Sequence, residues 1–146
     1  QLVLTGLNRY IKNNPRLYCY ANEDIAAPIA SGSFLSEAMI IIPCSMGTVA
    51  AVAHGMSDNL IERAADVMLK ERRKLILVPR ETPFSTIHLA NMLKLSQIGA
   101  VILPAIPAFY HHPASVEDMI SFVVGKTLDQ IGIEHDIFKR YQGNIN

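Results

Sequence analysis

The sequence has only two cysteines, Cys19 and Cys44, and no excess of charge of either sign. Two cysteines give no disulfide framework and fit a reducing compartment. A formal net charge of +0 gives no reason to expect nucleic acid or an anionic membrane surface as a partner. No apolar run approaches the roughly 20 residues of a membrane span, and no secretory leader is visible. We therefore expect a cytoplasmic chain without a membrane span.

Common nucleotide-binding and hydrolase motifs are missing as well. The sequence contains no G-x-G-x-x-G, no Walker A loop and no G-x-S-x-G. Hydrophobic residues make up 50% of the chain, which is enough for a sizeable core, and 146 residues fit one domain. Strand-like apolar runs alternate with helical patterns, which predicts an α/β fold with a parallel sheet and helices on both faces. We expect one domain over residues 1–146.

Turn residues divide the chain into expected elements. The expected strands are 16–20, 39–42, 74–79 and 99–104, and the expected helices are 1–14, 49–55, 59–73, 84–98 and 115–131. Pro43 has no N–H to donate, so we expect it to end its strand. The loop over 22–36 is either a functional lid or a plain connection. The tail from Glu134 either packs on a neighbouring segment or is loose.

The stretch from Met39 to Thr48 carries the clearest signal for a site. Met39 to Ile42 predict a buried strand, and the small residues from Ser45 then lead into a helix. This arrangement exposes unpaired backbone N–H groups and the positive end of a helix dipole at the carboxyl edge of the sheet. Anionic or electron-rich ligands bind at such edges. An ordinary strand-to-helix turn has the same pattern, so both interpretations stay open.

Polar residues follow the next two strands at the same predicted edge. Arg80 and Glu81 come directly after the strand 74–79, and Tyr110 lies in the loop after the strand 99–104. They are site candidates because ligands bind at this edge. The alternative for Arg80 and Glu81 is a charge pair that caps the next helix. His111 and His112 have no third ligand at a suitable spacing, so we expect no metal site.

Two cations of the expected helix 59–73 share one of its faces. Arg63 and Lys70 are seven residues apart, which places them on nearly the same stripe. Such a pair could grip a phosphate. The alternative is a solvated face on which acidic neighbours such as Asp66 balance the charge.

Taken together, these segments resemble the UbiX-type flavin prenyltransferases of the flavoprotein decarboxylase-like superfamily, formerly described as aromatic-acid decarboxylases. The matching pieces are Ala30–Ser33, Pro43–Thr48, Arg63–Arg73, Val78–Pro83 and Pro107–His111. They occur in the family's order and cover nearly the whole chain. The P-A-S-A-N-T loop of the related cysteine decarboxylases is not seen, and Ser31-Gly32-Ser33 points to the prenyltransferase branch.

The resemblance implies a fold and an activity. The fold is a three-layer Rossmann-like, or flavodoxin-like, parallel sheet. The activity joins a dimethylallyl group from dimethylallyl phosphate to N5 and C6 of reduced FMN, without a metal. The product is the cofactor of a separate UbiD-type decarboxylase that serves ubiquinone or aromatic-acid metabolism. The family is typically a homo-dodecamer with its sites between subunits.

The resemblance also implies roles for residues. The residues expected to contact FMN are Ser45, Met46, Gly47, Thr48 and Arg80. The residues expected to bind dimethylallyl phosphate are Ser31, Arg63, Lys70, Arg80, Tyr110 and Lys126. Glu81 and Lys70 are expected to be catalytic, with Glu81 moving the proton at C6. Many relatives have arginine at the position of Lys126, and lysine keeps the charge but loses the bidentate fork.

The family's first strand and its G-A-S-type glycine loop, with a serine near flavin N5, are not seen in the sequence. We expect that they were omitted or are disordered, and that the function stands. Two alternatives remain. The first is an FMN-dependent aromatic-acid decarboxylase, and the second is a non-catalytic flavin-binding or assembly protein.

Overall fold

The computed structural model describes residues 14–110 and 112–141. Residues 1–13 of the helix expected over 1–14 lie outside this described part, and so does His111. Among the described residues, the strands form one parallel sheet in the order β1-β2-β3. They are β1 (Ala38–Cys44), β2 (Lys74–Pro79) and β3 (Val101–Ile102).

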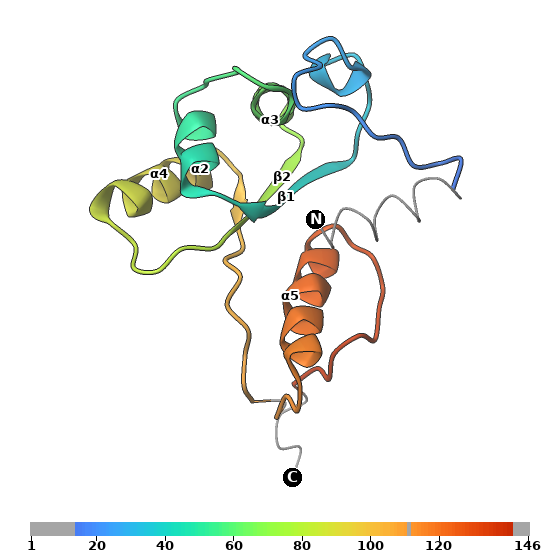
Figure 1. Cartoon of the computed structure of the whole chain (residues 1–146), viewed down its shortest axis with the longest axis vertical. Coiled ribbons are helices and arrows are strands. Elements are labelled where there is room, and N and C mark those ends of the chain that lie inside the picture. The colour runs from blue at the N-terminus through green and yellow to red at the C-terminus, as the bar shows by residue number, and fades with distance from the viewer. Residues whose placement is uncertain (1–13, 111, 142–146) are drawn as a thin grey trace.

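Helices lie on both sides of this sheet (Figure 1). One side carries α2 (Met46–Ala53), α3 (Leu60–Lys70) and α4 (Thr86–Gln97), and the other side carries α5 (Val116–Gln130). A short 3-10 helix, η1 (Pro28–Ala30), lies against α3. The α/β class, the parallel sheet and the layered arrangement expected from the sequence are therefore confirmed.

The core follows from the composition of β2. Side chains alternate across a strand, so Leu75 and Leu77 point to one face, where they join the main core cluster with Val49 and Leu95. The strand is buried from Leu75 to Pro79. A strand that is covered on both faces explains the unbroken apolar run that predicted it.

Side-chain caps start the helices at the expected places. The Asn59 side chain accepts a hydrogen bond from the Glu62 N–H at 3.0 Å. The Ser115 hydroxyl accepts one from the Asp118 N–H at 3.1 Å, and the Asp118 carboxylate accepts in return from the Ser115 N–H at 3.0 Å. Each cap satisfies an N–H that has no partner inside the helix. Asn59 and Ser115 are the N-caps of α3 and α5, so these helices begin where the expected helices 59–73 and 115–131 begin.

Three details of the expected elements are wrong. Residues 16–20 form no strand; Tyr18 is 77% exposed, and the segment pairs with no strand among the described residues. Pro43 does not end β1, which continues to Cys44 through a shift in register after Ile41. β3 contains two residues, fewer than the expected strand 99–104.

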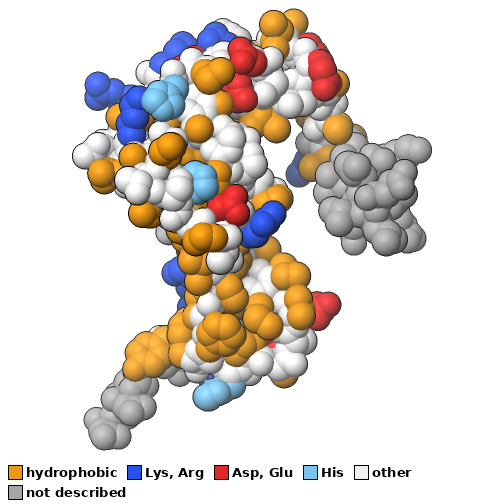
Figure 2. Space-filling view, turned by 60° about the vertical axis from the view of Figure 1, so that its left-hand side comes forward, with side chains coloured by type: hydrophobic (Ala, Val, Ile, Leu, Met, Phe, Trp, Pro, Cys, Tyr) orange, Lys and Arg blue, Asp and Glu red, His pale blue; other side chains and the backbone are white. Residues whose placement is uncertain are grey.

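No helix of the described residues is long and apolar enough to cross a membrane. α5 stands off the sheet, and a groove of about 260 Å³ separates its apolar side from the ends of β1 and β2. Val116 and Ile120 line this groove and are 62% and 56% exposed. Hydrophobic side chains also gather on the lower surface of the molecule, over α5 (Figure 2).

Candidate functional site

The carboxyl ends of the strands meet at one edge of the sheet. Cys44, the last residue of β1, is paired with Pro79, the last residue of β2. The Ala105 N–H donates to the Pro79 carbonyl at 2.9 Å, which brings the loop after β3 to the same edge. Ser45 and Arg80, which directly follow these strands, therefore begin the loops of one shared edge.

α2 begins at this edge and presents its N-terminus there. The Ser45 hydroxyl accepts a hydrogen bond from the Thr48 N–H at 3.1 Å and lies 3.0 Å from the Thr48 hydroxyl. The N–H groups of Met46 and Gly47 lie in the first turn, where a helix supplies no acceptor. Among the described residues, a Cβ added to Gly47 would meet only the Ser45 hydroxyl, at 3.7 Å. The backbone is thus open to an anionic group at the positive end of the helix dipole.

Arg80 and Glu81 line a cavity of about 210 Å³ at the same edge, together with Pro104, Ala105 and other neighbours. Arg80 is exposed and has no hydrogen-bond or ion-pair partner among the described residues. The Glu81 carboxylate accepts a hydrogen bond from the Thr82 N–H at 3.1 Å. A guanidinium without a partner and a carboxylate in one cavity can bind an anion and move a proton.

Arg63 connects α3 to η1. Its Nε donates to the Ala30 carbonyl at 3.1 Å, and its Nη1 donates to Asp66 at 3.1 Å. Asp66, which the alternative of a solvated helix face names as an acidic neighbour, is therefore paired with Arg63. The exposed fraction of both side chains is above one third, at 38% and 36%, so the pair adds little stability.

Lys70 lies beside the loop that carries Ser31 and Gly32. Its Nζ donates to Glu71 at 2.6 Å, and this hydrogen bond is the main cause of the lowered pKa of the Glu71 carboxyl. A Cβ added to Gly32 would lie 2.3 Å from Glu71 Oε1 and 2.8 Å from Lys70 Nζ. The loop therefore passes close to the ends of these two side chains, which would have to move to admit a side chain at position 32. The Ser31 hydroxyl lies 2.8 Å from that of Ser33.

Tyr110 and Lys126 belong to the α5 side of the molecule. The ring of Tyr110 makes edge contacts with Phe122 and Tyr141, with centroids 6.1 Å and 5.7 Å apart. Lys126 Nζ lies 3.6 Å from the carboxylate of Asp129. Sequence reasoning did not single out Asp129, and its spacing of three residues from Lys126 was the available signal.

The candidate residues thus form separate groups in one chain. The edge group is Ser45 to Thr48 with Arg80 and Glu81. Lys70 ends α3, shortly before β2 begins at Lys74, so it lies toward the amino end of a strand that spans about 20 Å. Arg80 follows the other end of the same strand. The structure therefore assembles the edge group and leaves Lys70 at the opposite edge of the sheet.

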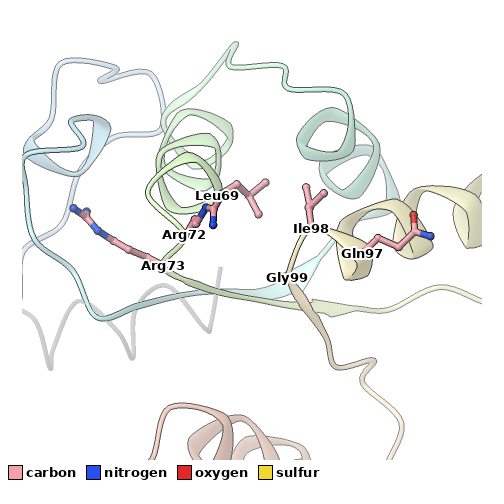
Figure 3. Close-up of a pocket in the computed structure, with 6 residues that line it drawn as sticks. All are labelled: Leu69, Arg72, Arg73, Gln97, Ile98 and Gly99. Carbon is pink, nitrogen blue, oxygen red and sulfur yellow. The ribbon is translucent and has the colours of Figure 1, made fainter.

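A second cavity, of about 570 Å³, lies at this opposite edge between the ends of α3 and α4 (Figure 3). Its lining includes Leu69, Arg72 and Gly99. Arg73 also lines it, and its guanidinium donates to the Gly32 and Phe34 carbonyls at 2.6 and 2.7 Å. None of the residues predicted to bind FMN or phosphate lines this cavity.

Cys44 is not suited to nucleophilic chemistry. It is 1% exposed, and burial raises the pKa of its thiol to about 11. The thiol therefore stays protonated at neutral pH, and the thiolate is the reactive form. In residues 14–110 and 112–141, no group of three or more His, Cys, Asp or Glu side chains is placed to hold a metal ion.

The family model described as Flavoprotein matches residues 9–128. The chain belongs to the flavoprotein family. A curated relative of this flavoprotein, the flavin prenyltransferase UbiX of Alkalihalophilus pseudofirmus, is 61% identical over 125 residues. That match covers 86% of this chain and 62% of the relative, so the chain spans less than two thirds of the relative's length. The resemblance drawn from the sequence motifs is confirmed.

Solved structures show the same flavoprotein fold. AnUbiX, crystallised in complex with FMN and dimethylallyl pyrophosphate, is 52% identical with a TM-score of 0.85, covering 86% of this chain and 67% of that one. A dodecameric FMN-dependent UbiX-like decarboxylase from Escherichia coli O157:H7 is 55% identical with a TM-score of 0.83, covering 85% and 67%. These similarities confirm the flavodoxin-like sheet.

Proposed function

We propose that this flavoprotein acts as a flavin prenyltransferase. It joins a dimethylallyl group from dimethylallyl phosphate to N5 and C6 of reduced FMN, and the product serves a UbiD-type decarboxylase of ubiquinone or aromatic-acid metabolism in the cytoplasm. The observation that carries the proposal is the 61% identity to a relative named flavin prenyltransferase UbiX. The AnUbiX complex with FMN and dimethylallyl pyrophosphate supports both ligands.

The edge group suits FMN. The free N–H groups of the first turn of α2 and the Ser45 and Thr48 hydroxyls offer hydrogen bonds to its polar atoms. Gly47 leaves the backbone open, and Arg80 has no competing partner among the described residues. We therefore assign FMN to Ser45, Met46, Gly47, Thr48 and Arg80.

The cationic residues suit the phosphate of the substrate. Breaking an allylic C–O bond leaves the phosphate with extra negative charge, and cations with a phenol stabilise that charge as it develops. Reduced FMN, when bound, supplies the electron-rich atoms that the allyl group joins. The residues assigned to the phosphate are Ser31, Arg63, Lys70, Arg80, Tyr110 and Lys126. Glu81 takes the proton from C6 as a general base.

A complete site requires more than one copy of the chain. Lys70 and Arg80 lie toward opposite ends of β2, so a single chain does not place both around one phosphate. On α4, Ile87 and Leu93 are 72% and 60% exposed, which suits burial between copies. The dodecameric relative supports this arrangement. We propose a homo-oligomer, expected to be a dodecamer, in which residues 1–146 contribute one flavoprotein domain per subunit.

Phosphate release tests the reaction. The full-length protein is incubated without oxygen with dimethylallyl phosphate and either reduced or oxidised FMN, and inorganic phosphate is measured. The proposal predicts release in step with the amount of reduced FMN and none with oxidised FMN. Release of carbon dioxide from an aromatic acid, with FMN and without dimethylallyl phosphate, would favour the decarboxylase alternative instead.

A further inference from the structure

The segment from Gly132 to Tyr141, here named the C-terminal strap, returns along α5 (Figure 1). A Cβ added to Gly125 of α5 would lie 2.4 Å from the Phe138 ring and 2.7 Å from the His135 ring. The rings of Phe138 and Phe122 make an edge contact with centroids 5.0 Å apart. Because these contacts leave no room for a side chain at position 125, the strap is closely packed and holds its side chains in defined places.

One carboxylate joins the strap to α5. Arg140 donates to Asp129 through Nη1 at 3.1 Å and through Nη2 at 2.6 Å. His135, whose side chain is 5% exposed, points its Nε2 to Asp129 at 3.0 Å and to the Gly125 carbonyl at 2.8 Å. Both partners are acceptors, so Nε2 carries the proton.

Two basic side chains, those of Lys126 and Arg140, share this single carboxylate. Lys126 Nζ lies 3.6 Å from Oδ2 of Asp129, the same oxygen to which Arg140 Nη1 donates. The two cations are therefore neighbours, and one negative charge does not balance them. Their side chains are 46% and 51% exposed, so an anion from solvent can reach both.

The phenol assigned to the phosphate lies at the same place. The Tyr110 ring contacts that of Tyr141, which directly follows Arg140 in the strap. The pKa of Arg140 is raised mainly by its hydrogen bonds to Asp129 and also by the nearby Tyr110. Arg140 thus lies among the residues of the α5 side that are assigned to the phosphate, Tyr110 and Lys126.

We propose that Arg140 is a further binding residue for the phosphate of the isoprenyl substrate, next to Lys126. A guanidinium has five N–H donors, and the hydrogen bonds to Asp129 leave others for a phosphate. This inference rests on the proposed function, because it names a residue of the same phosphate site.

The alternative is that Arg140 only fastens the strap to α5. Two variants of the full-length protein separate these roles. Arg140→Gln removes the cation and the pair with Asp129, whereas Asp129→Asn breaks the charged pair and keeps the cation. Lys139→Gln is the matched control, because it removes an exposed cation of the same strap that has no partner within residues 14–110 and 112–141. The dissociation constants of dimethylallyl phosphate and FMN are measured for each variant by calorimetry.

We expect Arg140→Gln to weaken the binding of dimethylallyl phosphate about ten-fold or more, since a charge-assisted hydrogen bond is lost. Arg140→Lys should lose less, and Lys139→Gln should bind like the wild type. Asp129→Asn should retain most of the affinity. The affinity for FMN should stay within about two-fold throughout.

Equal losses in Arg140→Gln and Asp129→Asn would overturn the inference, because they would show that only the fastening matters. So would an unchanged affinity in Arg140→Gln while the wild-type protein prenylates FMN; the proposed function would then stand without Arg140. If the wild-type protein binds no dimethylallyl phosphate, the proposed function fails and the inference fails with it.

Discussion

At the scale of single residues, Glu81 has the clearest chemical assignment. It lines the edge cavity with Arg80, and its carboxylate makes a hydrogen bond only to the neighbouring Thr82 N–H among the described residues. The rest of its acceptor capacity is therefore available to a ligand. This position follows from the strand before it, because β2 ends at Pro79 and its carboxyl end faces the site.

We expect Glu81→Gln to lower the turnover of prenylation about 100-fold or more, because glutamine keeps the shape and cannot take a proton. The affinity for FMN should stay within about two-fold of the wild type. Turnover is measured by phosphate release and affinity by flavin fluorescence. Turnover at the wild-type rate in this variant would remove Glu81 from the mechanism.

At the scale of elements, the N-terminus of α2 supports the assignment of FMN. Packing in the described part of the chain does not need Gly47, since an added Cβ would meet only the Ser45 hydroxyl there, at an ordinary distance of 3.7 Å. A glycine at a place where the fold does not require one leaves room for a ligand to approach the backbone closely.

Gly47→Ala should leave the thermal unfolding midpoint unchanged or slightly higher, because alanine favours helix. The same variant should weaken FMN binding about ten-fold by blocking the approach to the backbone. Gly99→Ala is the matched control. Gly99 has a φ of 99° after α4, so alanine there should cost about 1 kcal/mol of stability and leave FMN binding unchanged. Equal FMN affinity in the Gly47 variant and the wild type would contradict the assignment.

The strap has a predictable dependence on pH. Hydrogen bonds from Arg140 are the main cause that lowers the pKa of Asp129 from 3.8 to about 2. Because the pKa of Asp129 is lower in the folded state than in the unfolded state, ionised Asp129 stabilises the folded state at pH values above its unfolded-state pKa. This contribution is lost as the pH falls toward 2.

We therefore expect the difference in free energy of unfolding between the wild type and Asp129→Asn to be constant above about pH 5. It should shrink as the pH falls below about 4. Denaturant unfolding at several pH values measures it, with the exposed Asp136→Asn as control. A difference that stays the same down to about pH 2 would show that Asp129 is not held ionised by this pair.

The sequence correctly predicted those helices and strands whose formation depends on residues close together in the chain. The apolar run 74–79 predicted the bounds of β2, and the expected helices 59–73 and 115–131 begin at Asn59 and Ser115, which cap α3 and α5. Residues 16–20 also had a strand-like composition, but a strand needs a neighbour to pair with, and no local pattern shows whether one is present. The sequence left open whether the tail from Glu134 packs on a neighbouring segment, because Asp129, His135 and Arg140 come together only in the folded chain.

At the scale of the whole molecule, the arrangement of the site residues points to an assembly. The edge group is complete within one chain, whereas Lys70 lies at the other edge of the sheet and Tyr110 and Lys126 lie on the α5 side. Under the proposed function one phosphate needs all of these groups, so we expect it to bind where copies of the chain meet. The exposed apolar residues of α4 give such copies a surface to bury.

The mass of the flavin after reaction tests the central claim most directly. The full-length protein is incubated without oxygen with reduced FMN and dimethylallyl phosphate, and the released flavin is analysed by mass spectrometry. Prenyl transfer predicts the mass of FMN plus one C5H8 unit. Unmodified FMN, recovered from protein that is shown to bind both ligands, would contradict the account.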